Sequence, residues 1–233
     1  MLAVFVNCGA IILGSLIGLI FSKKISGELS GIVQSAAGVV SMVLGIQMTF
    51  EYQNIIFLAI SLILGGIIGS FLDIDGKILK LGDFFSYLAN KNNNEEEESG
   101  FAYAFLNASV LFCVGAMSII GSFKAGMDKD YTIIFTKSVL DGFMAIVFTA
   151  AMGIGTAFSA ITVFVYQGAL TLLAGFIASY ASDTLIAELT AAGGALIIMI
   201  GINLIGLKKI KTANYLPAVV LSVIFVLIQQ VIS

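Results

Sequence analysis

The sequence predicts an all-α polytopic membrane protein with about eight transmembrane helices in a single domain, residues 1–233. Hydrophobic residues make up 59% of the chain and charged residues only 11%, whereas soluble domains carry about 25% charged residues. Several apolar stretches also reach the roughly 20 residues that a helix needs to cross a hydrocarbon core of ~30 Å. Glycines recur within these stretches at the spacing of close helix contacts, as in Gly14-xxx-Gly18 and Gly65-xxx-Gly69.

The predicted spans, in chain order, cover approximately residues 2–22, 31–50, 54–72, 101–122, 132–153, 157–180, 187–207 and 214–232. The lysines next to the first stretch follow it, so we expect a retained transmembrane helix and not a cleaved signal peptide. The linkers at 51–53 and 154–156 are very short, which predicts that each joins two adjacent antiparallel helices.

The loop at residues 73–100 is the longest connection between the predicted spans. Its first part mixes apolar and charged residues in a pattern typical of a short amphipathic helix on the membrane surface. Its second part is polar and includes the acidic run Glu95–Glu98, which indicates a solvated, disordered linker. We therefore expect an amphipathic and acidic loop on the cytoplasmic side.

The distribution of lysine predicts this orientation, because cytoplasmic loops of membrane proteins are enriched in basic residues. With eight spans, one set of loops holds eight lysines, and the opposite set holds two, Lys124 and Lys129. The lysine-rich loops are therefore expected in the cytoplasm, and both termini outside.

The residue types exclude several functions. The chain has no histidine, which removes histidine-based catalysis and imidazole metal ligands. Its cysteines, Cys8 and Cys113, lie in apolar stretches and are expected to be buried free thiols. The sequence contains no nucleotide-binding loop, catalytic dyad or basic nucleic-acid patch. We therefore predict no enzymatic activity, no cofactor and no nucleic-acid partner, and leave metal binding open.

Lys137 and Asp141 stand four residues apart inside the predicted span 132–153. Residues at that spacing share one face of a helix, so the ammonium and the carboxylate can meet. Asp141 is expected about 15 Å into the membrane, where each charge costs at least ~2.5 kcal/mol and normally faces the bundle interior or a water-filled cavity. Two interpretations stay open: a structural ion pair that pins neighbouring helices, or a site that binds or conducts a solute.

Residues 1–72 and 157–233 form two predicted repeats, on either side of a central helix pair at 101–156. The similarity is clear between residues 6–20 and 165–179. Because the repeats begin five spans apart, an odd number, they must cross the membrane in opposite senses. Spans one to three and six to eight would then form an inverted repeat, an arrangement found in many secondary transporters.

Residues 27–47 and 187–203 align across a four-residue gap. In this alignment Gly38 and Gly45 correspond to Gly194 and Gly201, and Gln47 corresponds to Asn203. Transporters with inverted repeats place their substrate sites near the midplane, where the repeats meet. Buried amides suit a polar solute or a partly dehydrated ion because they both donate and accept hydrogen bonds. The alternative is ordinary interhelical hydrogen bonding, worth ~0.6 kcal/mol per bond on average.

The predicted substrate or ion site consists of the ion pair and the amides inside the spans: Asn7, Gln47, Asn107, Lys137, Asp141, Gln167 and Asn203.

Three stretches, residues 105–126, 137–175 and 193–218, resemble the bacterial YqgA/YdfK-like membrane proteins, the family of unknown function numbered 554. The most specific pieces are FCVGAM, KSVLDG, YQG and the closing NYLPA. The resemblance covers nearly the whole chain and implies a multi-pass protein of the bacterial inner membrane. It implies no substrate or mechanism, so no site residue follows from it.

The leading hypothesis is a secondary transporter or permease for a small ion or polar solute. Asp141 would bind a proton or cation, with Lys137 as its counter-ion or as an anion contact. An ion channel could use the same residues. A non-transporting scaffold or regulatory membrane protein would instead use the loop at 73–100 as its docking surface. The expected partners are the lipid bilayer and the solute, and a homo-oligomer stays open.

Overall fold

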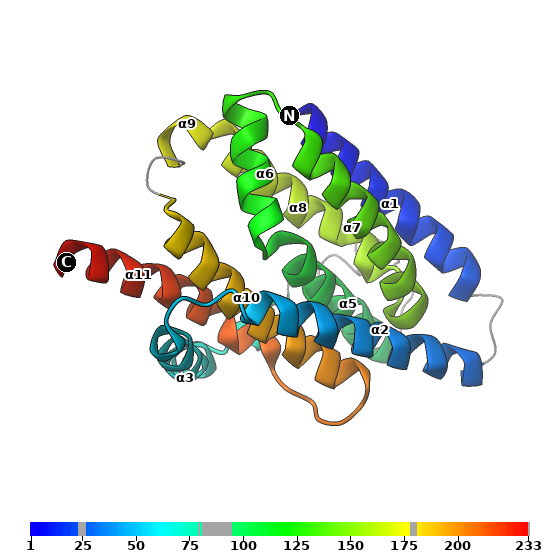
Figure 1. Cartoon of the computed structure of the whole chain (residues 1–233). Coiled ribbons are helices and arrows are strands. Elements are labelled where there is room, and N and C mark those ends of the chain that lie inside the picture. The colour runs from blue at the N-terminus through cyan, green and yellow to red at the C-terminus, as the bar shows by residue number, and fades with distance from the viewer. Residues whose placement is uncertain (23–26, 79, 81–94, 178–180, 233) are drawn as a thin grey trace.

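The computed structural model describes residues 1–22, 27–78, 80, 95–177 and 181–232, and within these ranges the chain forms helices and turns without a strand (Figure 1). The helices are, in chain order, α1 (Leu2–Ser22), α2 (Gly27–Thr49), α3 (Ile55–Phe71), α5 (Glu95–Cys113), α6 (Ala116–Met127), α7 (Thr132–Met152), α8 (Gly155–Leu172), α9 (Ala174–Ile177), α10 (Asp183–Leu204), the 3-10 turn η1 (Thr212–Tyr215) and α11 (Leu216–Ile232).

The predicted fold class, an all-α polytopic membrane protein, is confirmed. Among the described residues, six helices are long and apolar enough to cross a membrane: α1, α2, α7, α8, α10 and the unit of η1 with α11. α5, from Gly100, and α6 are apolar enough only as a pair, which bends by 61° and fits either one broken span or a re-entrant loop. α3 has 17 residues and is about 26 Å long, slightly shorter than a ~30 Å core. The count of eight spans therefore stays a prediction.

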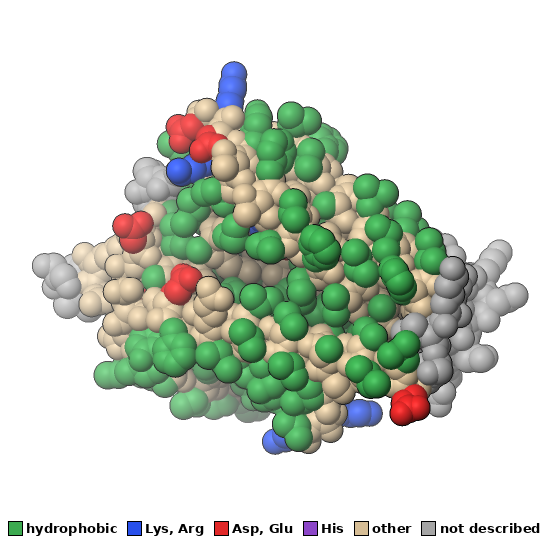
Figure 2. Space-filling view, turned by 45° about the vertical axis from the view of Figure 1, so that its right-hand side comes forward, with side chains coloured by type: hydrophobic (Ala, Val, Ile, Leu, Met, Phe, Trp, Pro, Cys, Tyr) green, Lys and Arg blue, Asp and Glu red, His purple; other side chains and the backbone are tan. Residues whose placement is uncertain are grey.

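The outer faces of the helices carry large apolar side chains. Leu13, Ile63 and Phe143 are each more than 60% exposed. In Figure 2 such side chains are spread over the visible face, and the few charged side chains lie mostly at its left, top and lower edge. Soluble monomers rarely expose apolar patches beyond a few hundred Å², so this surface is one that contacts lipid.

α5 begins at Glu95, so the expectation of a disordered run at Glu95–Glu98 is wrong. Glutamate is a good helix former, so a run of four glutamates is compatible with a helix. Residues 74–78 are also helical, in agreement with the start of the predicted amphipathic helix. The remainder of that predicted loop, apart from residue 80, lies outside the described residues as far as residue 94.

α1 packs along α7 through small residues (Figure 1). A methyl group added at Gly14 would overlap the carbonyl oxygen of Gly142, and one added at Gly18 would overlap that of Ile146. The backbones approach this closely because neither glycine has a side chain. The predicted Gly14-xxx-Gly18 contact is thus confirmed, and it lies one residue from Asp141.

Gly14→Ala is therefore expected to lower the free energy of unfolding by about 1–3 kcal/mol, since one helix must move away from the other. Gly9→Ala is the matched control on the same helix, because nothing lies within 4 Å of a methyl group placed there. The measurement is thermal and denaturant unfolding in detergent. Equal effects of the two substitutions would contradict the close contact.

The linker between α2 and α3 does not form the predicted hairpin. α2 crosses α10, and α3 packs against α11 (Figure 1). The linker is held instead by Glu188 of α10, whose Oε1 accepts hydrogen bonds from the backbone N–H groups of Gln53 (2.8 Å) and Asn54 (2.6 Å). The other short linker joins α7 to α8, and these two helices do contact each other.

α2 and α10 cross at two pairs of glycines. A methyl group added at Gly45 would lie 2.7 Å from the carbonyl oxygen of Gly194, and one added at Gly201 would lie 2.7 Å from that of Gly38. The crossing therefore has two equivalent points of close approach, one in each half of the helix pair.

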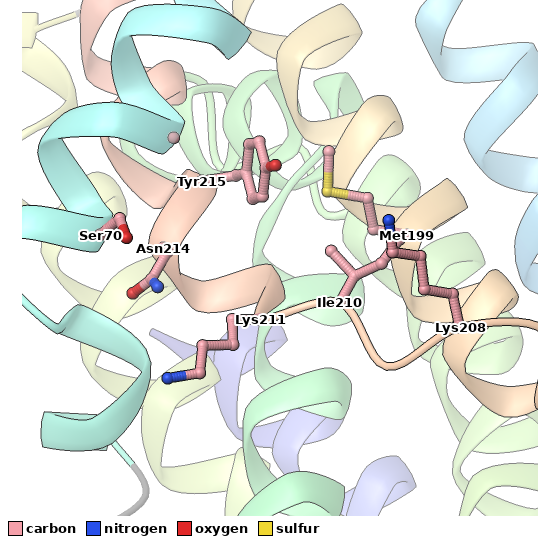
Figure 3. A pocket seen from close by; sticks show the side chains of 8 residues that line it. Ser70, Met199, Lys208, Ile210, Lys211, Asn214 and Tyr215 are labelled. Atoms are coloured by element: carbon pink, nitrogen blue, oxygen red, sulfur yellow. The ribbon is translucent and has the colours of Figure 1, made fainter.

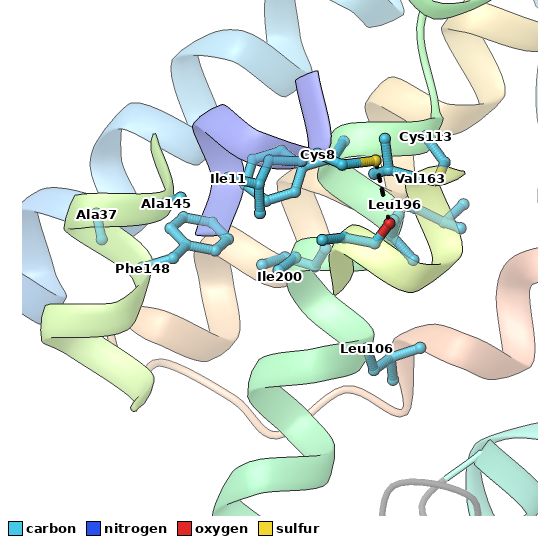
Figure 4. Close-up of a cluster of buried hydrophobic side chains, with 14 of the residues drawn as sticks. Cys8, Ile11, Ala37, Leu106, Cys113, Ala145, Phe148, Val163, Leu196 and Ile200 are labelled. Atoms are coloured by element: carbon cyan, nitrogen blue, oxygen red, sulfur yellow. Dashed lines mark hydrogen bonds between the residues drawn. The ribbon is translucent and has the colours of Figure 1, made fainter. Parts of the chain in front are cut away.

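The largest apolar core joins α1, α5, α7, α8 and α10, and part of it is drawn in Figure 4. Ile11, Phe148 and Leu196 are fully buried there. Cys8 and Cys113 belong to this core as free thiols, as predicted. The Cys8 thiol donates a hydrogen bond to the carbonyl oxygen of Ala160 (3.4 Å), which satisfies its one donor.

Candidate functional site: a buried polar cluster beside a broken span

The candidate site is built on α7, where Lys137 and Asp141 lie one turn apart and form an ion pair. Both side chains turn into the bundle, with 6% and 7% of their surface exposed. Asp141 is the tenth of the 21 residues of α7, about 14 Å from its start. The pair therefore lies near the middle of the span.

Two amides from other helices extend the pair into a cluster. Asn7 of α1 donates from Nδ2 to the Oδ2 atom of Asp141 (3.0 Å) and to the Oε1 atom of Gln167 on α8 (3.1 Å). Gln167 in turn donates from Nε2 to the hydroxyl oxygen of Ser118 on α6 (3.1 Å). Asn7 and Gln167 are fully buried, so each amide must find its partners inside the protein.

The cluster lies against the break between α5 and α6. Gly115 at this break has φ 135° and ψ 151°, a conformation that is essentially restricted to glycine. The Ser118 hydroxyl donates to the carbonyl oxygen of Phe112 (3.0 Å), which bridges the break. The Lys137 ammonium also lies 5.9 Å from the centre of the Phe112 ring, within the range of a cation–π contact. Phe112, at the end of α5, therefore contacts both the ion pair, through its ring, and the first turn of α6, through its carbonyl oxygen.

One hydrogen-bond acceptor of the cluster has no partner. Both protons of the Asn7 Nδ2 atom are donated, but its Oδ1 atom is buried without a hydrogen-bond partner. A buried acceptor without a partner costs about 1–3 kcal/mol. The cluster thus holds one cation, one anion and an unsatisfied carbonyl oxygen, which together can contact a small cation or a polar solute.

Four of the seven predicted site residues come together in this cluster: Asn7, Lys137, Asp141 and Gln167. The other three lie elsewhere. Asn107 is buried on α5 and donates to the Met152 sulfur (3.6 Å). Gln47 is exposed near the end of α2.

Asn203, near the end of α10, holds the loop that follows. Its Nδ2 atom donates to the carbonyl oxygen of Ile210 (2.9 Å), and its Oδ1 atom accepts from the Ile210 backbone N–H (2.7 Å). Its amide is thus engaged within its own loop, and the structure does not place it beside the ion pair.

Ser118 and Phe112 were not predicted as site residues. A serine in a span commonly bonds to its own helix, and a phenylalanine in an apolar run looks like any core residue. The signal that could have identified both is Gly115 between them, since a glycine can interrupt a span. In a chain with 25 glycines that signal does not stand out.

Among the described residues, no three Cys, Asp or Glu side chains are grouped closely enough to hold a metal ion. Any cation at this cluster would therefore meet one carboxylate together with amide and backbone oxygens, a donor set for a weakly held ion or a proton and not for a tightly bound transition metal.

The fold and the cluster define a class of protein: a polytopic helical membrane protein with an interrupted span and a buried ion pair beside it. The chain belongs to the family described as "Protein of unknown function (DUF554)", whose model matches residues 2–227. The family predicted from the FCVGAM, KSVLDG, YQG and NYLPA stretches is thereby confirmed.

Two relatives match along nearly their whole length. The chain is 35% identical over 227 residues to "Uncharacterized membrane protein YdfK" of Bacillus subtilis, covering 95% of this chain and 94% of the relative. It is 27% identical over 222 residues to "Uncharacterized protein YqgA" of Escherichia coli, covering 94% and 93%. No solved structure matches the chain.

Proposed function

We propose that the protein is a secondary transporter for a small ion or polar solute, with Asn7, Lys137, Asp141 and Gln167 as its midplane site. The observation that carries the proposal is the buried ion pair, joined by amides of two other helices, beside the break at Gly115. Ionisable residues inside spans mark ion and substrate pathways, and interrupted helices form the sites of many transporters.

The packing of α2 on α10 supports an inverted repeat. In the sequence alignment Gly38 corresponds to Gly194 and Gly45 to Gly201. The observed contacts pair Gly38 with Gly201 and Gly45 with Gly194. Exchanging the two repeats turns the first contact into the second, which is the behaviour expected at a two-fold axis that relates the repeats.

The cluster also lies where these repeats would meet. Asn7 belongs to the first predicted repeat and Gln167 to the second, and they share a hydrogen bond. Rocking of one repeat against the other would break that bond and change access to Asp141. In the conformation described here the pair is occluded.

In this proposal Asp141 carries the coupling proton or cation, and Lys137 neutralises it when the site is empty. The protein lies in the bacterial inner membrane with its lysine-rich loops in the cytoplasm and both termini outside. The energy source is an ion gradient, because the sequence contains no nucleotide-binding loop.

The test is flux in proteoliposomes across a panel of inorganic ions and small organic solutes, with an imposed pH or sodium gradient. For a transported solute, Asp141→Asn is expected to abolish gradient-driven flux, because the neutral amide cannot bind and release the coupling ion. The matched control is Asp128→Asn, at an exposed acid beyond the end of α6, and it should transport like the parent chain.

Unchanged flux and pH dependence in Asp141→Asn would remove Asp141 from the mechanism. Flux that follows the solute's own gradient without a coupling ion, at rates orders of magnitude above transporter turnover, would instead assign a channel. Absence of flux for every tested solute, together with normal folding, would favour the scaffold hypothesis over transport.

A further inference from the structure

A second polar site lies away from the ion pair, in a cavity of about 370 Å³ between α3, α10, the loop after α10 and the 3-10 turn η1 (Figure 3). Small-molecule sites range from about 300 to 1,000 Å³, so the volume suits a compact head group. The polar side chains that line it are Ser70 on α3, Lys208 and Lys211 on the loop after α10, and Asn214 and Tyr215 on η1.

The loop that carries the lysines is tied down by hydrogen bonds. Asn203 bonds to both backbone groups of Ile210, between Lys208 and Lys211 (2.9 and 2.7 Å). Gly206 starts the loop with φ 77°, a left-handed conformation that favours glycine. The ammonium groups are therefore presented from an ordered backbone, and Asn203 acts as a positioning residue for them.

Asn214, which lines the cavity, has an amide that offers a donor. Its Oδ1 atom accepts from the backbone N–H of Asp75 (2.9 Å), and an N–H can donate only to the oxygen of the amide. The Nδ2 atom of Asn214 therefore remains as a donor. With the hydroxyls of Ser70 and Tyr215 and the two ammonium groups, the lining is rich in donors.

The charge of the lining is positive. None of the residues that line the cavity is acidic. Asp75, whose charge interacts with that of Lys211, is 1% exposed, and its Oδ1 atom accepts from the backbone N–H of Ala213 (3.3 Å). Burial raises the pKa of Asp75 above its usual value, while the Ala213 N–H and the charge of Lys211 act in the opposite direction. Asp75 thus weakens the positive potential without occupying the cavity.

Apolar side chains flank the cavity on the outer surface. Phe71, next to Ser70, is 87% exposed, and Leu207, next to Lys208, is 74% exposed. A charged pocket bordered by exposed apolar residues at the end of a span matches the boundary between lipid head groups and acyl chains.

We propose that this cavity binds a phosphate-bearing anion, held by Lys208 and Lys211 together with the donors of Asn214, Ser70 and Tyr215. The phosphate belongs either to the head group of an anionic phospholipid or to a free phosphate ester. Binding here does not depend on the transport proposal, since none of these residues contacts the ion pair.

The experiment titrates the purified full-length protein in detergent with phosphatidylglycerol, phosphatidylcholine, glycerol 3-phosphate and inorganic phosphate. Lipid adducts are counted by native mass spectrometry, and the free anions are followed by calorimetry. The test variant is Lys208→Gln with Lys211→Gln. The control variant is Lys124→Gln with Lys129→Gln, which removes two exposed lysines elsewhere.

The test variant is expected to bind the anion about 25-fold more weakly, at about fivefold for each lysine, whereas the control variant binds like the parent chain. Preference for phosphatidylglycerol over phosphatidylcholine identifies a lipid site, and comparable affinity for glycerol 3-phosphate identifies a free phosphate ester. Both results support the proposal. Equal losses in the two double variants, or no binding of any of the anions by the parent chain, overturn it.

Discussion

Lys137→Met is expected to lower the free energy of unfolding by about 3–5 kcal/mol, because it leaves the Asp141 carboxylate buried without its cation. The double variant Lys137→Met with Asp141→Leu removes both charges at similar volume and should cost much less. Thermal unfolding in detergent can be followed with a thiol-reactive dye, since Cys8 and Cys113 are both buried in the folded protein. Lys124→Met, at an exposed lysine of α6, is the stability control.

The same variants separate a structural ion pair from a functional one. A purely structural pair predicts that flux follows stability, so the double variant would regain transport together with its fold. The transport proposal predicts that the double variant folds but has no gradient-driven flux, since no coupling group remains. A double variant that both folds and transports would therefore contradict the role assigned to Asp141.

The sequence predicted the centre of this cluster for a physical reason. A charge or an amide in the middle of an apolar span is too costly to face lipid, so it must turn inward and find a partner. Lys137 and Asp141 do so on one helix, four residues apart. Asn7 and Gln167 do so across two helices that the repeat alignment had already matched near these positions.

Near the helix ends, water and loop backbone are available, so a polar side chain there needs no partner inside the bundle. Gln47 stands near the end of α2, and its amide can remain exposed there. Asn203 finds its partner seven residues further along the chain, in a loop whose course no local pattern reveals. The break at Gly115 was not predicted, because the stretch 101–122 is apolar on both sides of it and its hydrophobic pattern shows no interruption there.

The role of Glu188 was hidden in the same way. The sequence analysis assigned Glu188 no role, yet its carboxylate holds the linker before α3. It is fully buried and accepts two backbone hydrogen bonds from the linker before α3, while its Oε2 atom has no hydrogen-bond partner. These bonds hold the linker at the point where the chain leaves α2 for α11, an arrangement that a short linker alone would not predict.

Glu188→Ala is therefore expected to lower the free energy of unfolding by about 2–4 kcal/mol, since it removes two charge-assisted hydrogen bonds and leaves a cavity. Glu188→Gln keeps an acceptor oxygen for the N–H groups of Gln53 and Asn54 and should cost less than half as much. Glu51→Ala, at an exposed acid beside the same linker, is the control and should stay within about 0.5 kcal/mol of the parent chain. If Glu188→Gln proves as damaging as Glu188→Ala, an acceptor oxygen alone does not hold the linker, and the carboxylate itself is required.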